Sequence, residues 1–357
     1  MSISLTAVRR RPVLDRRALT PLVSLGVALL VVGILLASVG VDPLGAAQSM
    51  LDSSFGTPRN FGEVLIRATP LLLIAATLVP SLRAGLYNIG SPGQMGAGAL
   101  AATLVALAMP GQSNLLVLAC CALASAIAGV AVAIVPGGLK AYFGVNEIIS
   151  TLAINFIMIS VLGYLLNGPM QSDFANLPQS DVLPPSASLP VIIPDTRAHI
   201  GLVLALLLVP LLLLAGRSRM GYKLRVFGAN PQLLRQARVS RKRYVIGLMA
   251  TGGLGAGLAG WVQVAGVDHR LYQGIAEPVG YAGLFVALLG LLHPLGIVVA
   301  AVALGFLLHG GDSLQVGAGV SPEIVQVLLG LILLAYAARP PASATPPVAA
   351  LSDGKES

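Results

Sequence analysis

Apolar runs long enough to cross a lipid bilayer recur along almost the whole chain. A helix needs about 20 apolar residues, within a range of roughly 17 to 25, to cross the hydrocarbon core. In lipid every backbone N–H and C=O must find a partner inside the protein, and a helix supplies one for each. The pattern therefore predicts an all-α polytopic membrane protein. The runs lie near residues 19–39, 62–82, 93–109, 115–136, 147–166, 199–215, 244–264, 280–309 and 321–338.

The composition agrees with a membrane protein and argues against other classes. Of 357 residues, 56% are hydrophobic and only 10% are charged, and the mean hydropathy is +0.86. A net charge of +8 would suggest nucleic-acid binding in a soluble protein, but here the basic residues lie in short segments between the apolar runs. The preference of Lys and Arg for the cytoplasmic side explains this placement, so we expect no nucleic-acid partner. Cys120 and Cys121 are adjacent in an apolar run, which predicts neither a disulfide framework nor a metal site.

The number of spans depends on the apolar region 280–309, which is broken at His293 and Pro294. A tight turn at this break gives ten helices, whereas a kink gives nine. With ten helices and the N-terminus inside, the inside segments hold eighteen Lys and Arg and the outside segments hold three. This asymmetry favours about ten helices, within a range of eight to ten, and places both termini in the cytoplasm.

The chain is expected to consist of a membrane domain and two polar ends. Residues 1–18 form a basic N-terminal segment, and the first apolar run follows without a signal-peptide cleavage site, so we expect it to be retained as a span. The membrane domain covers residues 19–338, and residues 339–357 are typical of a disordered tail. The external loop 167–198, rich in Pro, Ser and Asp, is expected to have little regular structure. It is either a docking surface for an external partner or a tolerated insertion.

The segment 216–244 is long and polar between two apolar runs, and it carries nine Lys or Arg and no Asp or Glu. Asn230 followed by Pro231 predicts an N-cap and a first helical position, and hence a short helix to about Arg238. Ser240, just before the next apolar run, is a second expected N-cap. The segment either only fixes the orientation of the chain in the membrane or presents a rigid docking helix, and residue spacing leaves both interpretations open.

Local signals in the apolar runs predict how helices begin and pack. Asn146 has the position of an N-cap, with Glu147 in the first turn, where a carboxylate favours the helix dipole. Gly253 and Gly257 are four residues apart, a spacing that lets two helix backbones approach closely in a membrane. We therefore expect a helix to begin near residue 146 and close helix packing along the glycine-rich stretch 251–260.

The sequence offers no catalytic constellation. It lacks the metalloprotease and serine-hydrolase motifs, and none of its four lysines follows the glycines of a phosphate-binding loop. We therefore expect a transport protein without catalytic residues, a metal site or a cofactor of its own. If transport uses ATP, the nucleotide site lies on another chain.

Carboxylates near mid-membrane, which bind the coupling ion in many secondary transporters, are not expected here. The candidate acidic residues fall at the ends of apolar runs, and Glu63 has the i, i+4 spacing of a local ion pair with Arg67. The residues expected to line a solute pathway are polar but uncharged, which suits a neutral polar solute. They are Asn88, Gln94, Asn155 and Gln263. An ion-coupled secondary transporter of a small neutral polar solute is the alternative hypothesis.

Five polar or glycine-rich stretches stand out in order along the chain. They are GLYNIGSPGQMGAGAL (85–100), KAYFGVNEIISTLAINF (140–156), LRVFGANPQLLRQARVSRKRY (224–244), GGLGAGLAG (252–260) and VALLGLLHPLGIVVAAVALGFL (286–307). Together they resemble the permease subunits of bacterial ATP-binding cassette importers for nucleosides and simple sugars, which include the ribose permease and the guanosine and uridine permeases. The resemblance extends over roughly residues 62–338.

The resemblance implies a type II importer fold in the bacterial inner membrane and ATP-driven import of a nucleoside, or of ribose or another simple sugar. The implied partners are a second permease subunit in a heterodimer, a cytoplasmic ATPase in two copies and an external solute-binding lipoprotein, with membrane lipid around the chain. The segment 216–244 would contain the coupling helix that docks on the ATPase. The residues matched are Gly228, Asn230, Pro231 and Ala237 for coupling, and Asn88 and Gln94 for the pathway.

Overall fold

A computed structural model describes residues 30–31, 33–38, 40–173, 177–229 and 240–318, together with the single residues 327, 330 and 331. The chain divides into two compact units, one formed by residues 1–47 and 314–357 and the other by residues 48–313. Helices α3 to α11 all lie in the second unit.

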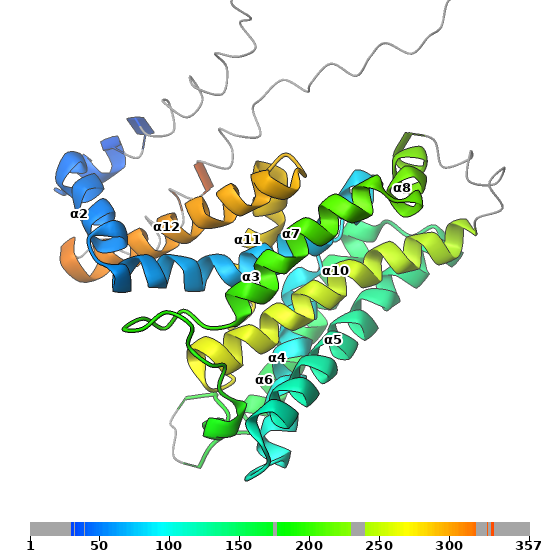
Figure 1. Ribbon diagram of the computed structural model, residues 1–357, viewed down its shortest axis with the longest axis horizontal. Coiled ribbons are helices and arrows are strands. Elements are labelled where there is room, and N and C mark those ends of the chain that lie inside the picture. Colours follow the sequence, from blue (N-terminus) through cyan, green and yellow to red (C-terminus); the bar gives the residue numbers. More distant parts are fainter. Residues whose placement is uncertain are drawn as a thin grey trace, which may run out of the picture. The chain divides into compact units, whose positions relative to one another are not determined.

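Regular structure in this part of the chain is helical, apart from two isolated β-bridges. Among the residues that the structure describes, five helical segments are long and apolar enough to cross a membrane, and α7 and α11 are shorter apolar helices. The all-α membrane fold is confirmed, whereas the total of about ten spans and the side of the termini stay predictions. The helices are α2 (Pro43–Phe55), α3 (Pro58–Arg83), α4 (Ser91–Ala108), α5 (Asn114–Gly138), α6 (Glu147–Leu166), α7 (Gly201–Arg217), α8 (Arg219–Ala229), α10 (Arg241–Gln263), α11 (Glu277–Leu289) and α12 (Pro294–Ala318), with π-helices η1 (Leu139–Phe143) and η3 (Val264–Asp268) and the 3₁₀ helix η2 (Pro185–Ala187) (Figure 1).

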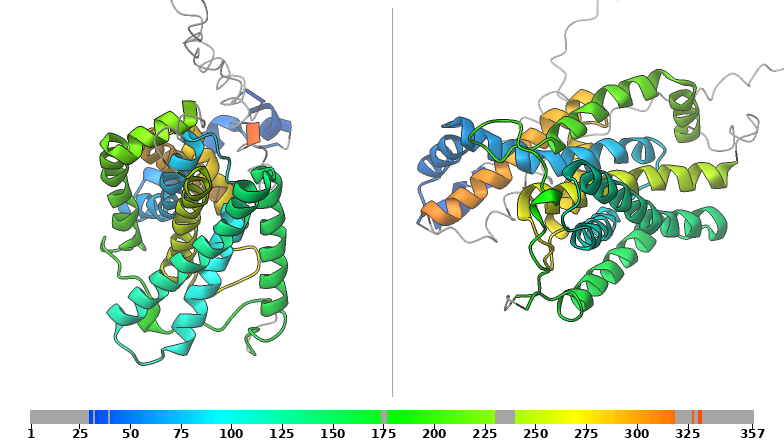
Figure 2. Two further views of the ribbon diagram at one scale, coloured as in Figure 1. Left: turned by 90° about the vertical axis from the view of Figure 1, so that its right-hand side faces the viewer. Right: turned by 60° about the horizontal axis from the view of Figure 1, so that its bottom comes forward.

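Helix α10 packs against α3, α4 and α5 (Figures 1 and 2). Glycines make this packing close. A Cβ added at Gly257 would meet the backbone of Ser125 and Gly129 in α5, and one added at Gly98 of α4 would meet the backbone of Gly257. Helices in lipid associate through such van der Waals contact, because the surrounding lipid removes the hydrophobic drive between them. The tight contact expected from Gly253 and Gly257 is confirmed.

Two helix starts predicted from local signals agree with the structure. Asn146 caps α6, since its side-chain oxygen accepts a hydrogen bond of 2.9 Å from the backbone N–H of Ile148. Ser240 holds the N-cap position of α10, although its side chain makes no capping hydrogen bond. The helix predicted from about Pro231 to Arg238 lies outside the described residues.

The break at His293 and Pro294 is a turn between two helices. Helix α11 ends before this pair, and α12 begins at Pro294. Leu291 and Leu292 in the turn have φ angles of 55° and 56°, in the left-handed region that bulky side chains rarely adopt. The guanidinium of Arg83 donates a hydrogen bond of 2.7 Å to the carbonyl of Leu292, which ties this turn to the end of α3.

Candidate functional site

Helix α4 begins after a non-helical stretch, residues 86–90, and the polar side chains around its start are buried. Asn88 and Gln94 are both completely buried. The Asn88 side-chain nitrogen donates to the Gln94 side-chain oxygen over 3.2 Å, and the Gln94 nitrogen donates to the Asn88 oxygen over 3.0 Å. Each amide therefore satisfies the other, as buried polar groups require.

Asn155 of α6 adds to this cluster. Its side-chain oxygen accepts a hydrogen bond of 2.9 Å from the Gly93 N–H, and its nitrogen donates to the Ile89 carbonyl over 2.9 Å and to the Tyr281 hydroxyl over 3.4 Å. The Thr151 hydroxyl accepts from the Ile89 N–H over 3.3 Å. Side chains thus replace the helical hydrogen bonds that the unwound stretch lacks. We call this cluster the polar junction; its members are Asn88, Gln94, Thr151, Asn155 and Tyr281.

The amides of the polar junction have almost no exposed surface in this conformation. The cavity beside the polar junction measures about 10 Å³, which is at most the space of one water molecule. It is bounded by Pro92 and Gly93 of α4, Leu162 of α6 and Ala276 before α11. Amides and hydroxyls can exchange hydrogen bonds with a neutral polar solute, but here the amides are occupied by one another and by the backbone.

Gln263, the fourth residue predicted for the pathway, is not part of the polar junction. It ends α10, where its side-chain nitrogen donates to Asp268 over 2.9 Å. The residue of α10 beside Asn88 is Gly252. Gln263 lies eleven positions after Gly252 on the helix, or about 16 Å along the axis. The apolar run placed Gln263 in a span but carried no information on its depth.

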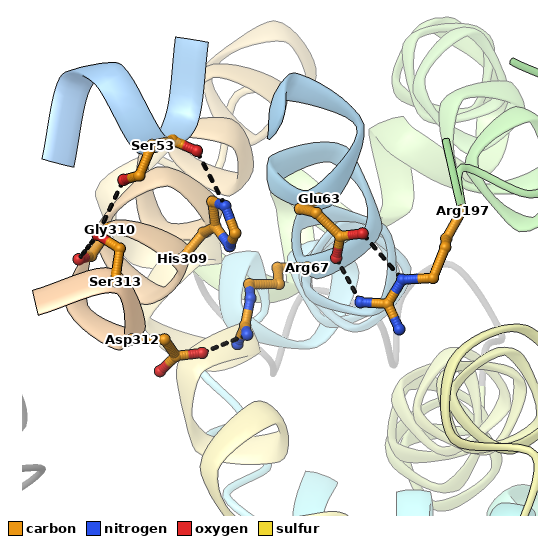
Figure 3. A network of polar contacts seen from close by, with 8 residues as sticks. All are labelled: Ser53, Glu63, Arg67, Arg197, His309, Gly310, Asp312 and Ser313. Atoms are coloured by element: carbon orange, nitrogen blue, oxygen red, sulfur yellow. Dashed lines mark hydrogen bonds and ion pairs between the residues drawn. The ribbon is translucent and has the colours of Figure 1, made fainter. Parts of the chain in front are cut away.

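The ion pair predicted between Glu63 and Arg67 on α3 is wrong, because each side chain has a distant partner (Figure 3). The Arg197 guanidinium donates to both oxygens of Glu63, over 2.8 Å from Nε and 2.5 Å from Nη2. Arg67 pairs with Asp312 of α12. A bidentate pair between Arg and a carboxylate is stronger than a single contact between neighbours on one helix. The two pairs join segments that are far apart in the sequence.

Further polar contacts link α12 to α2 beside these ion pairs (Figure 3). His309 Nε2 lies 3.1 Å from the Ser53 carbonyl oxygen, and the Ser53 hydroxyl donates to the Ser313 hydroxyl over 2.8 Å. A carbonyl oxygen can only accept, so Nε2 carries the proton in this contact. The polar network therefore connects α2, α3, α12 and the loop that carries Arg197.

Replacing Glu63 with glutamine should weaken the link between α3 and the 167–198 loop. The Glu63 carboxylate beside it raises the pKa of Arg197 above its usual range, so the pair is held by charge as well as by hydrogen bonds. Because Arg197 is largely exposed, we expect a loss of about 1 kcal/mol in the free energy of unfolding, seen as a lower thermal midpoint of the purified protein. The double variant with Glu63→Gln and Arg197→Gln should lose no more free energy of unfolding than the more destabilised of the two single variants. Additive losses would show that the two side chains act separately.

The 167–198 loop covers the end of α10. Three of its backbone N–H groups donate to carbonyls of the segment 265–271 over 2.8 to 2.9 Å. Its described part contains no helix beyond η2, which confirms the expected lack of regular structure for those residues. The loop leads to His199, which is 1% exposed and whose Nδ1 accepts a hydrogen bond of 3.2 Å from the Gly201 N–H.

The stability of the protein should fall below about pH 6.5 because of His199. Burial, with a smaller contribution from the nearby His269, lowers the pKa of His199 to about 4 from its usual 6.5. The folded protein keeps the ring neutral, while the unfolded chain takes up a proton as the pH falls through 6.5, so stability is complete above that pH and decreases toward pH 4. The loss approaches about 3 kcal/mol and can be measured by thermal unfolding across this pH range.

Two variants isolate the contribution of this ring. His199→Gln should flatten the pH dependence, because glutamine does not titrate. His269→Asn should preserve it, and asparagine tolerates the positive φ of 52° at that position. A pH profile that is the same in the His199 variant as in the unmodified protein would contradict the assignment.

Helices α7 and α8 are joined by Ser218, and α8 packs against the start of α10. Helix α8 follows α7 after one residue, and Phe227 of α8 packs in an apolar cluster with Val245 and Leu248 of α10. The centroids of the Phe227 and Tyr244 rings are 5.2 Å apart. The sequence prediction missed α8, although Leu224 and Phe227 have the i, i+3 spacing of an apolar helix face among the basic residues. This cluster fixes α8 to the membrane helices.

The segment 216–244 is thus described at its two ends. Of the residues predicted for coupling, Gly228 lies in α8. At the other end, the Lys242 ammonium lies 4.4 Å from the centre of the Tyr142 ring, a cation–π contact with η1. The remaining coupling residues lie outside the described residues. They are Asn230, Pro231 and Ala237.

Comparison with known proteins gives a consistent result. A family described as "Branched-chain amino acid transport system / permease component" matches residues 60–337. A glucose ABC transporter permease of Haloferax volcanii is 33% identical to the chain, covering 88% of it and 86% of the relative. A nucleoside ABC transporter permease of Lactococcus lactis is 28% identical, with 91% and 92% covered, and a guanosine ABC transporter permease of Bacillus subtilis is 29% identical, with 88% and 92% covered. No solved structure matches the chain.

Proposed function

The chain belongs to the family of permease components described for the branched-chain amino acid transport system, and on this premise we propose that it moves a nucleoside, or ribose or another simple sugar, into the cell. As a permease of an ATP-binding cassette system it is a multi-pass membrane protein and a transport subunit, not an enzyme. In the proposed complex, ATP is hydrolysed on a partner chain.

The composition of the polar junction supports a neutral solute. Its five side chains are amides and hydroxyls, with no carboxylate, ammonium or guanidinium among them. Nucleosides and sugars are neutral and present several hydrogen-bond donors and acceptors. By their names, two of the relatives transport nucleosides and a third transports glucose. Nucleosides and simple sugars therefore both stay candidate solutes for this chain.

The proposed pathway opens by exchange of hydrogen bonds. When the helix bundle rocks, Asn88 and Gln94 separate, and their amides bind the solute in place of each other. Asn155 holds the unwound stretch through the Ile89 carbonyl, so it keeps the start of α4 in place during the exchange. Gln263, farther along α10, would meet the solute at a different depth.

The segment 216–244 is proposed to receive the force of ATP hydrolysis. Gly228, Asn230, Pro231 and Ala237 would contact the cytoplasmic ATPase. Helix α8, fixed to α10 through Phe227, would pass a movement of this contact to the membrane helices. The basic charge of the segment is typical of a cytoplasmic location.

The remaining assembly follows from the same proposal. A second permease subunit completes the pathway in a heterodimer, and an external solute-binding lipoprotein docks at the 167–198 loop. About ten spans place residues 1–18 and 339–357 in the cytoplasm of a bacterium, with the chain in the inner membrane. These placements rest on the distribution of charge and on the family.

An ion-coupled secondary transporter has less support. Three carboxylates in or beside the described membrane helices are already paired with basic residues: Glu63 with Arg197, Glu147 with Lys140 and Asp312 with Arg67. Uptake into vesicles that contain this chain without an ATPase, and that depends on an ion gradient, would favour this alternative.

Competition for uptake tests the proposed solute. Cells that express the chain with its partner subunits should accumulate a radiolabelled nucleoside, and excess unlabelled nucleoside should compete better than ribose or glucose. Asn88→Ala should reduce the uptake rate at least about tenfold, because it removes both bonds to Gln94 and leaves that buried amide unpaired. Asn114→Ala, at the exposed start of α5, is the control. Uptake of none of these solutes would refute the proposal.

A further inference from the structure

A cavity of about 450 Å³ lies between α3, α7, α8 and α10. Its walls are almost entirely apolar. Leu208 of α7 and Leu254 of α10 line its deep part, and Arg83 and Arg243 line its other end. Because α10 runs from Arg243 to Leu254 along the wall, the cavity follows this helix for about 16 Å.

This length matches the depth of one leaflet of a bilayer. The hydrocarbon core is about 30 Å thick, so one leaflet contributes about 15 Å. Both α3 and α10 are long and apolar enough to span a membrane. The cavity therefore has the length and apolar lining that suit a lipid acyl chain, with the arginines where a headgroup would lie.

The charge around the basic end specifies the headgroup. The chain contains no Asp or Glu between residues 197 and 267. Besides Arg243, the adjoining ends of α7, α8 and α10 carry Arg217, Arg219, Lys223, Arg241 and Lys242. Basic pockets between membrane helices attract anionic lipid headgroups. A zwitterionic headgroup carries no net charge, so its electrostatic attraction to such a pocket is weaker. Tyr244 also lines this end of the cavity.

We propose that the cavity binds one anionic phospholipid, with an acyl chain against the apolar wall from Gly247 to Leu254 and its phosphate at Arg243. A Cβ added at Gly247 would have no heavy atom within 4 Å, so this face of α10 has room for an occupant. Gly221 and Leu224 of α8 line the same cavity. The bound lipid therefore fills the angle between α8 and α10.

Photolabelling of the assembled transporter tests this site. The probe is phosphatidylglycerol with a photoreactive group in its acyl chain, and labelled peptides are identified by mass spectrometry. We expect labelling of α7 and α10 peptides that excess phosphatidylglycerol suppresses and phosphatidylcholine suppresses at least fivefold less well. Gly247→Leu, which fills the cavity, and Arg243→Gln, which removes the charge, should each reduce labelling at least fivefold.

Matched controls separate binding from folding. Gly138→Leu adds the same side chain to a helix position where a Cβ meets no neighbour, and Arg59→Gln removes an exposed arginine that does not line the cavity. Both should label as the unmodified protein does, and all variants should elute as monodisperse complexes. Equal competition by the two lipids, equal labelling of all variants, or cross-linking of these peptides to a second permease subunit in place of lipid would overturn the proposal.

Discussion

Replacing Gly257 with leucine should remove nearly all correctly folded protein from the membrane. Gly257 lies where α10 touches α5, and an added Cβ would overlap the backbone carbonyl of Ser125. Neither backbone can withdraw freely, because the Ser125 hydroxyl also donates to the Gly98 carbonyl of α4 over 2.8 Å. Overpacking of a well-packed core destabilises a protein by about 1 to 3 kcal/mol. Overlap with a backbone atom should cost at least the upper value of this range, because a backbone moves less easily than a side chain. We expect the yield of monodisperse protein in detergent to fall at least about tenfold.

Smaller changes define the cause of this loss. Gly257→Ala should also lower the thermal midpoint, since the first added carbon already makes the contact. Gly138→Leu is the control, because a Cβ there meets open space and the residue lies at the end of α5. A stable Gly257→Leu protein would mean that α5 and α10 do not approach as closely as the structure indicates.

Replacing Asn230 and Pro231 together with alanine should stop solute uptake while the complex still hydrolyses ATP. If this pair starts the helix that docks on the ATPase, its loss removes an N-cap and a fixed first residue, and the docking surface is no longer rigid. We expect uptake to fall to less than about a tenth, because the uncoupled chain no longer follows the ATPase. ATPase activity and solute uptake measured in the same vesicles give the ratio of solute moved per ATP.

The competing interpretation of this segment predicts another result. If it only orients the chain, loss of positive charge should disturb the topology, and the Asn230 and Pro231 variant should transport normally. Arg235→Gln with Arg238→Gln removes two charges and keeps the predicted helix start, so it is the matched variant. Cysteine accessibility on the two sides of the membrane reports the topology. Normal uptake in the Asn230 and Pro231 variant would refute the coupling role.

Local features of the sequence were sufficient to predict two helix starts, the cap at Asn146 and the start of α10 after Ser240. The choice of a turn over a kink at His293 and Pro294 rested instead on the distribution of Lys and Arg along the whole chain. Asn88 drew attention because it interrupts an apolar pattern, and the structure buries it in a pair with Gln94, while its role in a solute pathway stays a prediction.

Contacts between distant segments were beyond such a prediction. Glu63 pairs with Arg197, 134 positions away, and a local i, i+4 partner was equally available in the sequence. Whether Glu63 pairs with Arg67 or with Arg197 depends on how the 167–198 loop packs against α3, and residue spacing does not predict this packing. Helix α8 was missed for another reason: its basic residues outweigh the apolar face that Phe227 provides.

The reciprocal hydrogen bonds between Asn88 and Gln94 bear on whether ions can leak through the protein across the membrane. An ion must keep its hydration shell or replace it, and the adjoining cavity of about 10 Å³ has no room for a hydrated ion. A potential of 100 mV acts on each elementary charge with about 2.3 kcal/mol, so a continuous aqueous path would discharge the cell. The amides of the polar junction are bonded to each other and leave almost no exposed polar surface in this conformation. If the proposed solute pathway passes through the polar junction, the transporter in this conformation should conduct no current.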